Sequence, residues 1–443
     1  MKKPPSVSVA EQERQGETVS ARWTRGPLRA FTSLRQRNYR SYWLGQMVSL
    51  IGTSMQTLGQ SWLVLKLTQS PLQLGLVGAL QFLPVLLFSI FGGVFADRWP
   101  KKRVLLLTQT ADMLLAFLLW VLVATDAVQL WHVYILVLLL GIASTLDKPA
   151  RQSFVIELVG RTELPNAVAL NFSIVNLARV VGPGLGGVII ALSGVKTLFL
   201  LNALSYGAAL LGLALINSHQ LYARPEQENR ASERQKTWQS LRAGVAYVWH
   251  TPAVLLTILV VGFVLLFGSN FGVVLPLFAT DVLNVGATGF GFLSAATGIG
   301  ALIATLWLAW SHQRPTLRAI LLGALIFSVV EAAFALSRSY VLSLALIAGI
   351  GFTEIFFATL AITALQTIAP DSLRGRVMSV YILFFDGSVP LGYLLTGWLA
   401  ALFGAPLSLL IGAILALLTT GAGWLRRKPA EVGFTEATRP EAR

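Results

Sequence analysis

The sequence predicts an all-α membrane protein with twelve transmembrane helices arranged in two halves of six. About a dozen apolar stretches between residues 41 and 425 are each long enough to cross a bilayer. Because lipid offers no partner for backbone N–H and C=O groups, such stretches must form helices that satisfy their own hydrogen bonds. Of the 443 residues, 55% are hydrophobic and 12% are charged, whereas soluble domains carry about 25% charged residues. Lys and Arg also gather in every second gap between the stretches, which gives each helix a direction.

The expected helices follow from the boundaries of these stretches. In chain order they cover residues 41–66, 71–96, 104–125, 130–147, 165–191, 196–217, 253–280, 287–310, 317–337, 340–366, 376–402 and 405–425. The expected helices at residues 165–191 and 376–402 carry Gly and Pro inside them, which membrane helices tolerate where neighbours satisfy the freed backbone groups. The predicted organisation is an N-terminal tail, a first half, a linker, a second half and a C-terminal tail, at residues 1–40, 41–217, 218–250, 251–425 and 426–443.

Within the linker, residues 237–250 predict a helix with one apolar face. That face carries Trp238, Leu241, Val245, Val248 and Trp249. A helix of this kind is expected to lie on the inner membrane surface. The alternative is a cytoplasmic extension of the helix that follows.

The distribution of positive charge predicts the topology. Thirty of the 34 Lys and Arg residues lie in the two tails, the linker and alternate loops. On the opposite side lie only Lys66, Lys196 and Arg338, and Arg179 falls inside a helix. The positive-inside rule therefore places both termini and the linker in the cytoplasm. The net charge of +14 is spread over one set of loops, which argues against a nucleic-acid partner, and the absence of Cys excludes disulfides and thiolate sites. The long polar stretch before the first helix argues against a cleaved signal peptide.

The two halves resemble each other weakly in sequence. In the first half, the polar turn at residues 161–166 precedes a helix containing Gly182-Pro183-Gly184-Leu185-Gly186-Gly187. In the second half, the turn at residues 371–376 precedes a helix containing Pro390-Leu391-Gly392 and then Gly397. Parallel repeats of this kind place a substrate path between the halves, near the middle of the membrane.

Several motifs resemble those of one transporter superfamily. Residues 93–103 (GVFADRWPKKR) are similar to the signature loop of the major facilitator superfamily, with Pro100 in place of its second Gly. The matching positions are Gly93, Asp97, Arg98, Lys101 and Lys102. The Gly182, Pro183, Gly186 and Gly187 pattern is similar to a motif of its exporter branches, and residues 147–152, 177–183 and 374–377 add to the likeness. Over residues 31–425 the chain resembles the drug and siderophore exporter branch that includes the enterobactin exporter and macrolide efflux pumps.

The resemblance implies roles for two of these motifs. Asp97 would pair with Arg374 or Arg376 across the two halves, forming a gate that closes the cytoplasmic side; the alternative is that the basic loop only anchors the topology. The helix with Gly182–Gly187 would pack against the second half and seal the outer side; the alternative is a tight packing seam without directional meaning.

Charged side chains inside the expected helices are the candidates for proton coupling. By their distance from the helix ends these are Asp112, Arg179, Glu331, Glu354 and Asp386. A charge near the bilayer centre costs at least about 2.5–3.5 kcal/mol, so it faces a cavity or a partner. Because burial disfavours the charged form of a carboxyl group, such an acid can take up a proton on one side and release it on the other. Asp386 and Glu354 are the first candidates, followed by Asp112 and Glu331; the alternative for each is a polar residue that holds two helices together.

Other charged positions carry different expectations. Arg179 is expected to be the counter-ion of one acid, and the alternative is a contact for an anionic substrate. Asp147 and Asp281 are expected to lie at the interface. Exporters of the resembling branch often carry a basic residue on the fourth helix, whereas the expected helix 130–147 contains none before Lys148.

Polar and aromatic residues are expected to line a central cavity. Gln46, Gln56 and Gln60 share roughly one face of the first helix. Further amides lie on other helices, and Phe267, Phe271, Phe356, Phe357, Phe384 and Phe385 are candidate apolar contacts. A large cavity of mixed character suits a bulky amphipathic cargo.

These observations predict a proton-coupled exporter of a small organic molecule such as a siderophore or a lipophilic drug, working by alternating access as a monomer in a bacterial inner membrane. Its partners would be the cargo, protons and lipid, without a cofactor or metal. The alternatives are an importer or uniporter, and a non-transporting receptor or assembly factor. The sequence lacks the phosphate-binding G-x-x-x-x-G-K-[ST] motif, its four His residues have no metal-ligand spacing, and no Ser-His-Asp arrangement is evident. An enzyme is therefore not expected.

Overall fold

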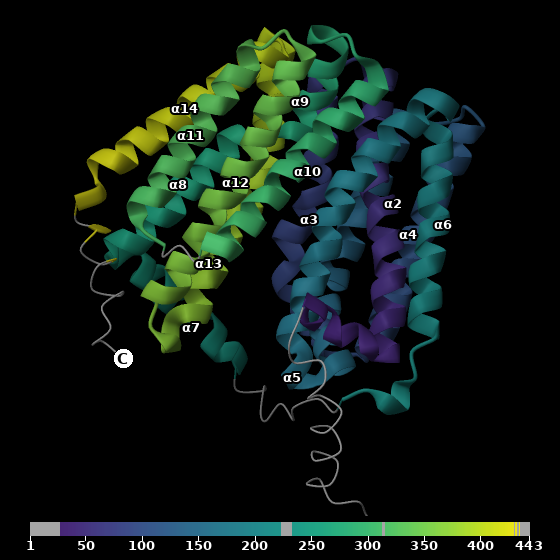
Figure 1. Cartoon of the computed structure of the whole chain (residues 1–443), viewed down its shortest axis with the longest axis horizontal. Coiled ribbons are helices and arrows are strands. Elements are labelled where there is room, and N and C mark those ends of the chain that lie inside the picture. The colour runs from purple at the N-terminus through teal and green to yellow at the C-terminus, as the bar shows by residue number, and fades with distance from the viewer. Residues whose placement is uncertain (1–26, 223–232, 312–314, 429, 432–433, 435–443) are drawn as a thin grey trace, which may run out of the picture.

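The computed structural model describes residues 27–222, 233–311, 315–428, 430–431 and 434. Every regular element within those ranges is a helix, and the helices form two bundles that lie side by side (Figure 1). The first bundle contains a 3₁₀ helix η1 (Pro27–Arg35), α2 (Arg37–Thr68), α3 (Pro71–Arg98), α4 (Lys101–Ala124), α5 (Leu130–Ser193), α6 (Val195–Ala214) and the short η2 (Ser218–Gln220).

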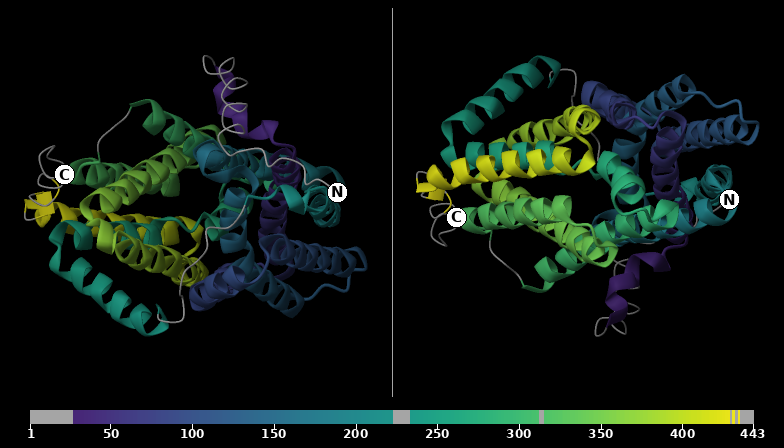
Figure 2. Two further views of the ribbon diagram at one scale, coloured as in Figure 1. Left: turned by 90° about the horizontal axis from the view of Figure 1, so that it is seen from below. Right: turned by 90° about the horizontal axis from the view of Figure 1, so that it is seen from above.

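The second bundle begins with a helix that lies outside the expected transmembrane segments. Its elements are α7 (Glu233–His250), α8 (Pro252–Gly268), α9 (Phe271–Leu277), the π-helical turn η4 (Phe278–Val282), α10 (Gly286–Ser311), α11 (Leu317–Leu336), α12 (Tyr340–Ile368), α13 (Asp371–Phe403) and α14 (Ala405–Leu425). Figure 2 shows α7 on the flank of this bundle, where it packs against α8 and α13. The side chains of Trp238 and Leu241 lie outside the described ones; of the other members of the expected apolar face, Val248 is buried, whereas Val245 and Trp249 are exposed.

The helices account for the twelve expected membrane crossings. By length and hydropathy, ten described helical segments qualify as spans, and α8, α9 and η4 together make one of them. Helix α5 counts once, yet its 64 residues would extend about 96 Å, roughly three times the thickness of the bilayer core. It folds back at Gly160 and therefore crosses twice. Helix α2 has 32 residues but is too rich in Gln, Ser, Thr and Gly to meet the hydropathy criterion.

Two boundaries differ from the sequence prediction in a way that matters for function. The fourth crossing was expected to end at residue 147, but it continues to Val159 with Pro149 inside it. Asp147, Lys148 and Arg151 consequently lie within a helix, and Asp147 is 7% exposed rather than interfacial. The seventh crossing, expected as one helix over 253–280, is interrupted at Ser269 and Asn270 between α8 and α9.

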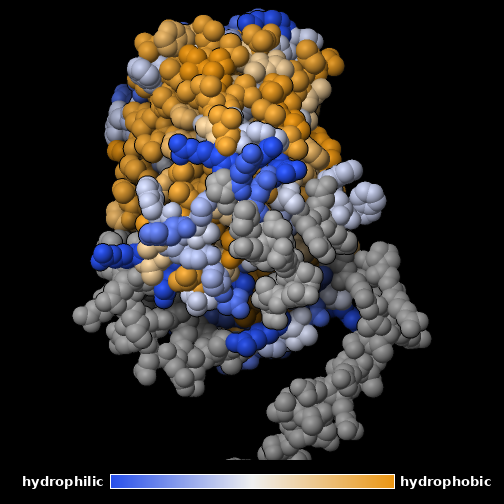
Figure 3. Space-filling view, turned by 90° about the vertical axis from the view of Figure 1, so that its left-hand side faces the viewer, coloured by the Kyte–Doolittle hydropathy of each residue, from blue (hydrophilic) through white to orange (hydrophobic). Residues whose placement is uncertain are grey.

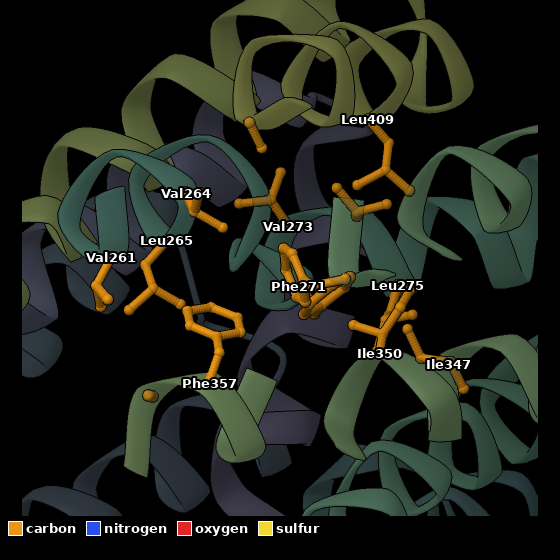
Figure 4. Packing of buried hydrophobic residues seen from close by; sticks show 14 of the residues in the cluster. Val261, Val264, Leu265, Phe271, Val273, Leu275, Ile347, Ile350, Phe357 and Leu409 are labelled. Carbon is orange, nitrogen blue, oxygen red and sulfur yellow. The ribbon is translucent and has the colours of Figure 1, made fainter. Parts of the chain in front are cut away.

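Apolar packing holds each bundle together and continues across both. Around α9, Phe271 packs among residues of α8, α12 and α14, including Val264, Leu265 and Ile350 (Figure 4). Figure 3 views the second bundle from its outer flank, where apolar residues cover a broad band with hydrophilic residues gathered at its lower and upper edges. Such a band is the surface that lipid tails contact in a membrane protein.

The fold-back at Gly160 depends on a backbone conformation that favours glycine. Its φ of 72° and ψ of 178° lie in a region that costs other residues about 1–3 kcal/mol, and a Cβ there would lie 3.1 Å from the ring of Tyr222. Gly160→Ala is therefore expected to lower the thermal unfolding midpoint of the purified protein. Gly207→Ala is the control, because it places its methyl group in open space in the middle of α6. Equal midpoints for the two variants would contradict this account of the turn.

Candidate functional site

A cavity of about 390 Å³ lies between the two bundles. Helices α2 and α5 of the first bundle and α9, α10, α12 and α13 of the second all contribute to its wall. The wall combines hydroxyl groups, aromatic rings and two charged side chains: Ser54, Thr57, Ser61, Ser269, Ser294, Thr297, Phe271, Phe290, Tyr393, Arg179 and Glu354. Pockets that bind small molecules have this mixture of apolar surface with a few polar groups.

The interruption between α8 and α9 brings a hydroxyl group to the acid of this cavity. Ser269 follows the last residue of α8, and its Oγ donates a 2.6 Å hydrogen bond to Oε1 of Glu354 on α12. The side-chain amide of Asn270 turns back and donates to the carbonyl oxygen of Leu266 at 2.8 Å. Broken helices at the middle of transporters commonly form ligand and ion sites, and this break brings Ser269 against Glu354 at the cavity wall.

Arg179 faces the same cavity from the first bundle. Its side chain is exposed and lines the cavity, and within the described part of the chain it makes no ion pair or side-chain hydrogen bond. Its positive charge nevertheless acts on Glu354. The expected role of Arg179 as the counter-ion of an acid is thus present only as a longer-range attraction, without direct contact.

Glu331 lies behind Glu354, inside the second bundle. It is 0% exposed, and neither of its carboxyl oxygens has a hydrogen-bond partner among the described residues. A Cβ on Gly268 would lie 2.6 Å from its Oε2, so the glycine at the end of α8 leaves the space that Glu331 occupies. Glu354 is the acid whose charge acts on it. The two glutamates therefore form an electrostatically coupled pair, of which only Glu354 reaches the cavity.

Asp386 lies on α13 and is half-buried. It does not line the cavity, and Lys148 of α5 is the cation that acts on it across the two bundles. Lys148 is exposed within the long fourth crossing. The sequence analysis placed this lysine in a loop, and so missed its electrostatic interaction with Asp386.

A second charged cluster lies inside the first bundle, around Asp147. Its carboxylate accepts hydrogen bonds from Thr108 and Gln109 of α4 at 3.0 Å and pairs with Arg151 at 2.6 Å. Asp112 of α4 lies close enough for the Asp147 and Arg151 charges to act on it. It is 8% exposed, and its Oδ1 has no partner among the described residues. Sequence reasoning found Asp112 but not this pair, although an Asp and an Arg four residues apart are a recognisable helical signal.

The pair in this cluster predicts a strong effect on stability. Asp147→Asn would leave the Arg151 guanidinium without its carboxylate in a mostly buried position, which typically costs about 3–5 kcal/mol. A lower unfolding midpoint of the purified protein is the expected result. The control is Asp371→Asn, which breaks the exposed ion pair with Arg374 and should cost at most about 1 kcal/mol. The idea fails if the two variants unfold at the same temperature.

The three glutamines of α2 lie away from the cavity. Gln46, Gln56 and Gln60 are 1%, 5% and 4% exposed, and Gln56 accepts a hydrogen bond from Asn202 of α6. None of them lines the cavity, to which α2 presents Ser54, Thr57 and Ser61 instead. The amide face that the sequence indicated therefore packs within the first bundle, and the neighbouring hydroxyl face meets the cavity.

Of the expected gate, Arg374 and Arg376 make no ion pair with the first bundle in the described part of the chain. Gly93, Asp97 and Arg98 fall on positions whose side chains the structure does not describe. Lys101 is buried at the start of α4, and Lys102 donates to the carbonyl oxygen of Ile216 at 2.8 Å. Arg374 pairs with Asp371 of its own helix, and Arg376 lies against Gly244 of α7. The gate stays a prediction.

The glycines near the ends of α5 and α13 do join the two bundles. A Cβ on Gly187 would lie 2.8 Å from the Cα of Gly291 on α10, and one on Gly397 would lie 2.9 Å from the Cα of Gly75 on α3. The carbonyl oxygen of Pro183 also lies at the contact between α5 and α10, where a Cβ on Gly291 would be 2.6 Å from it. Gly182 and Gly186 instead face α2, next to Ser54 and Leu58. The α5 motif therefore serves two contacts, one between the bundles and one within the first bundle.

The two glycine crossings, where α5 meets α10 at Gly187 and Gly291 and α13 meets α3 at Gly397 and Gly75, are related by the internal repeat. The part of α5 after Gly160 and helix α13 are the fifth membrane crossings of their halves, and α3 and α10 are the second. A Cβ on Gly187 would be blocked by Gly291 and by the carbonyl oxygen of Ala287, four residues before Gly291. In the same way, a Cβ on Gly397 would be blocked by Gly75 and by the carbonyl oxygen of Pro71, four residues before Gly75. Both crossings lie toward the end of the bundles opposite α7 and η1.

Comparison with known proteins places this arrangement among transporters. The profile of the transmembrane secretion effector family matches residues 28–436. The chain is 27% identical to the staphyloferrin A transporter of Staphylococcus aureus (strain NCTC 8325 / PS 47), over 80% of this chain and 87% of that protein. It is 28% identical to the multidrug efflux pump Tap of Mycolicibacterium fortuitum, over 79% and 86% of the two chains. It is also 28% identical to the enterobactin exporter EntS of Escherichia coli (strain K12), over 90% and 96%.

Solved structures show the same fold at low sequence identity. A bacterial homologue of the human lysosomal transporter Spinster, in an inward-facing and unoccupied conformation, superposes with a TM-score of 0.73 at 14% identity, covering 94% of this chain and 100% of that chain. The nucleoside transporter NupG gives a TM-score of 0.64 at 12% identity, covering 87% of this chain and 99% of that one. The predicted fold, with two six-helix halves, is confirmed.

Proposed function

This chain belongs to the transmembrane secretion effector family of the major facilitator superfamily, and from that premise we propose that it exports a small organic molecule in exchange for protons. The family and the curated relatives support transport out of the cell, because two of the three relatives are named as an exporter and an efflux pump. They also suggest siderophores and drugs as cargo.

The proposed orientation follows from charge. Thirty of the 34 Lys and Arg residues lie toward one side of the sequence-predicted topology, and the positive-inside rule makes that side cytoplasmic. The glycine crossings then lie toward the outer surface. Their close packing corresponds to a state that is closed to the outside, and export requires them to separate while the cytoplasmic ends come together. Alternating access of this kind is usually a rocking of one half against the other.

One observation carries the proposed coupling: Glu354 is the acid that faces the inter-bundle cavity. It lies beside a helix break, accepts a hydrogen bond from Ser269 and has no cation in direct contact among the described residues. A carboxyl group there can hold either a proton or a polar group of the cargo. Cargo that binds the carboxylate displaces the proton, so one ligand is exchanged for the other. Arg179, Glu331 and Tyr393 are the charged or titratable groups that interact electrostatically with Glu354.

The test is transport into everted membrane vesicles, which turns export into measurable uptake. Vesicles from cells that lack their own exporters would be given an inside-acid pH gradient and offered ethidium, enterobactin or staphyloferrin A. We expect gradient-dependent accumulation of at least one compound, and its loss when a protonophore collapses the gradient. Uptake that does not depend on the gradient would favour a uniporter, and uptake into right-side-out vesicles would favour an importer. If no compound is transported, the protein would instead be a receptor or assembly factor.

A further inference from the structure

Two opposite charges face the cargo cavity without neutralising each other by contact. Arg179 of α5 and Glu354 of α12 both line it, and no ion pair joins them. Glu354 receives one hydrogen bond, from Ser269 to Oε1. The guanidinium of Arg179 has no partner within the described residues. Charged side chains inside a membrane protein face a cavity or a partner, and a ligand that pairs with both would supply the charged partner that neither has by direct contact among the described residues.

We propose that the cargo is a dipolar amphiphile: an anionic oxygen group binds Arg179, and an ammonium or similar N–H donor binds Glu354. The inference rests on the proposed function and adds the chemical class of the cargo. Arginine presents a planar fork of N–H donors that matches a carboxylate or phosphate. A carboxylate is in turn the natural acceptor for an ammonium group.

The rest of the wall fits the uncharged part of such a molecule. Phe271, Phe290 and Tyr393 supply aromatic surface, and Ser294 and Thr297 supply hydroxyl groups from α10. An aromatic body would pack against the rings while its polar substituents meet the hydroxyls. The volume of about 390 Å³ suits a small organic molecule.

A dipolar cargo also gives proton exchange the correct sign. An ammonium group stabilises the ionised form of Glu354, so its binding releases the proton. A purely anionic cargo at Arg179 would have the opposite effect, because it would cancel the attraction between Arg179 and Glu354 and favour protonation of the glutamate.

The experiment compares three matched probes on the purified full-length protein. The first is 2-naphthylalanine, which carries both charges. The second is its amide, which carries only the positive charge, and the third is its N-acetyl derivative, which carries only the negative charge. We expect the zwitterion to bind at least about tenfold more tightly than either single-charge probe, as for a charge-assisted hydrogen bond. In Arg179→Gln the zwitterion and the amide should bind equally, and in Glu354→Gln the zwitterion and the N-acetyl probe should do so. Arg179→Lys keeps the charge and should retain part of the preference, which separates the effect of charge from misfolding.

Equal binding of all three probes to the wild-type protein would overturn the proposal, and so would preferences that persist in both variants. Nanodiscs of phosphatidylethanolamine and of phosphatidylglycerol distinguish two sources of the same chemistry. Weaker probe binding in the phosphatidylethanolamine nanodiscs would assign the site to a zwitterionic lipid headgroup. Equal binding in the two kinds of nanodisc would assign it to a soluble molecule. If the preferences hold but vesicle transport ignores the pH gradient, the proposed antiport fails while the cargo class stands.

Discussion

Glu354→Gln is expected to reduce pH-driven transport to the rate of vesicles without the protein. Glutamine keeps the shape of the side chain and can still accept the hydrogen bond from Ser269, but it cannot bind and release a proton. Cargo binding should also lose its dependence on pH in this variant. The measurement is gradient-driven uptake into everted vesicles, together with binding at about pH 6 and about pH 8, on either side of neutrality.

Asp281→Asn is the control for this variant. Asp281 is exposed at the end of η4 and hydrogen-bonded by its neighbour Thr280, so its neutralisation should leave transport unchanged. Glu331→Gln gives a further comparison, because Glu331 couples to Glu354 without reaching the cavity. It should alter the pH at which transport is half-maximal more than the maximal rate. Full gradient-driven transport by Glu354→Gln would remove this residue from the mechanism.

Gly187→Leu is expected to have the second large effect, because it would prevent α5 and α10 from packing together at the end of the bundles that we propose to be the outer one. The Cβ position already lies 2.7 Å from the carbonyl oxygen of Ala287 and 2.8 Å from the Cα of Gly291, so a leucine has no space while α5 and α10 remain in contact. We expect transport to fall at least about tenfold, the cost of overpacking being typically about 1–3 kcal/mol. Spin-label distances between the outer ends of α5 and α10 should lengthen.

Gly184→Ala, on the same helix, provides a matched control. Its added methyl group would meet only Ala295 Cβ at 3.7 Å, which is an ordinary contact. Because the repeat relates the two crossings, Gly397→Leu should resemble Gly187→Leu in both transport and distance. If Gly187→Leu transports normally with unchanged distances, the crossing does not hold the outer side closed.

The sequence predicted the transmembrane architecture because hydropathy and loop charge record it directly. Every expected crossing is present, since backbone groups in lipid leave a long apolar stretch no alternative to a helix. The errors arose where local signals mislead. The fourth crossing was expected to end at residue 147, where charged residues begin, yet it continues past Pro149 to Val159. That error removed Asp147, Lys148 and Arg151 from the candidate residues.

The composition of the site was less predictable than the fold. Glu354 and Arg179 were identified as buried charges, but their placement on one cavity depends on how the bundles meet at α10, which packs against both α5 and α12. Gln46, Gln56 and Gln60 are polar residues on one helix face, as expected, but that face packs inside the first bundle. The helical period tells which residues share a face, and it does not tell which neighbour the face meets.

Simultaneous measurement of cargo and proton flux in proteoliposomes tests the central claim most directly. The purified protein would be reconstituted with an internal pH dye and given an inside-acid gradient, with a compound that the vesicle panel identifies as cargo. The account predicts that each cargo molecule entering is accompanied by proton exit, and that Glu354→Gln stops both fluxes. Cargo accumulation that continues at the same rate after the gradient is collapsed, or without proton movement, would contradict it.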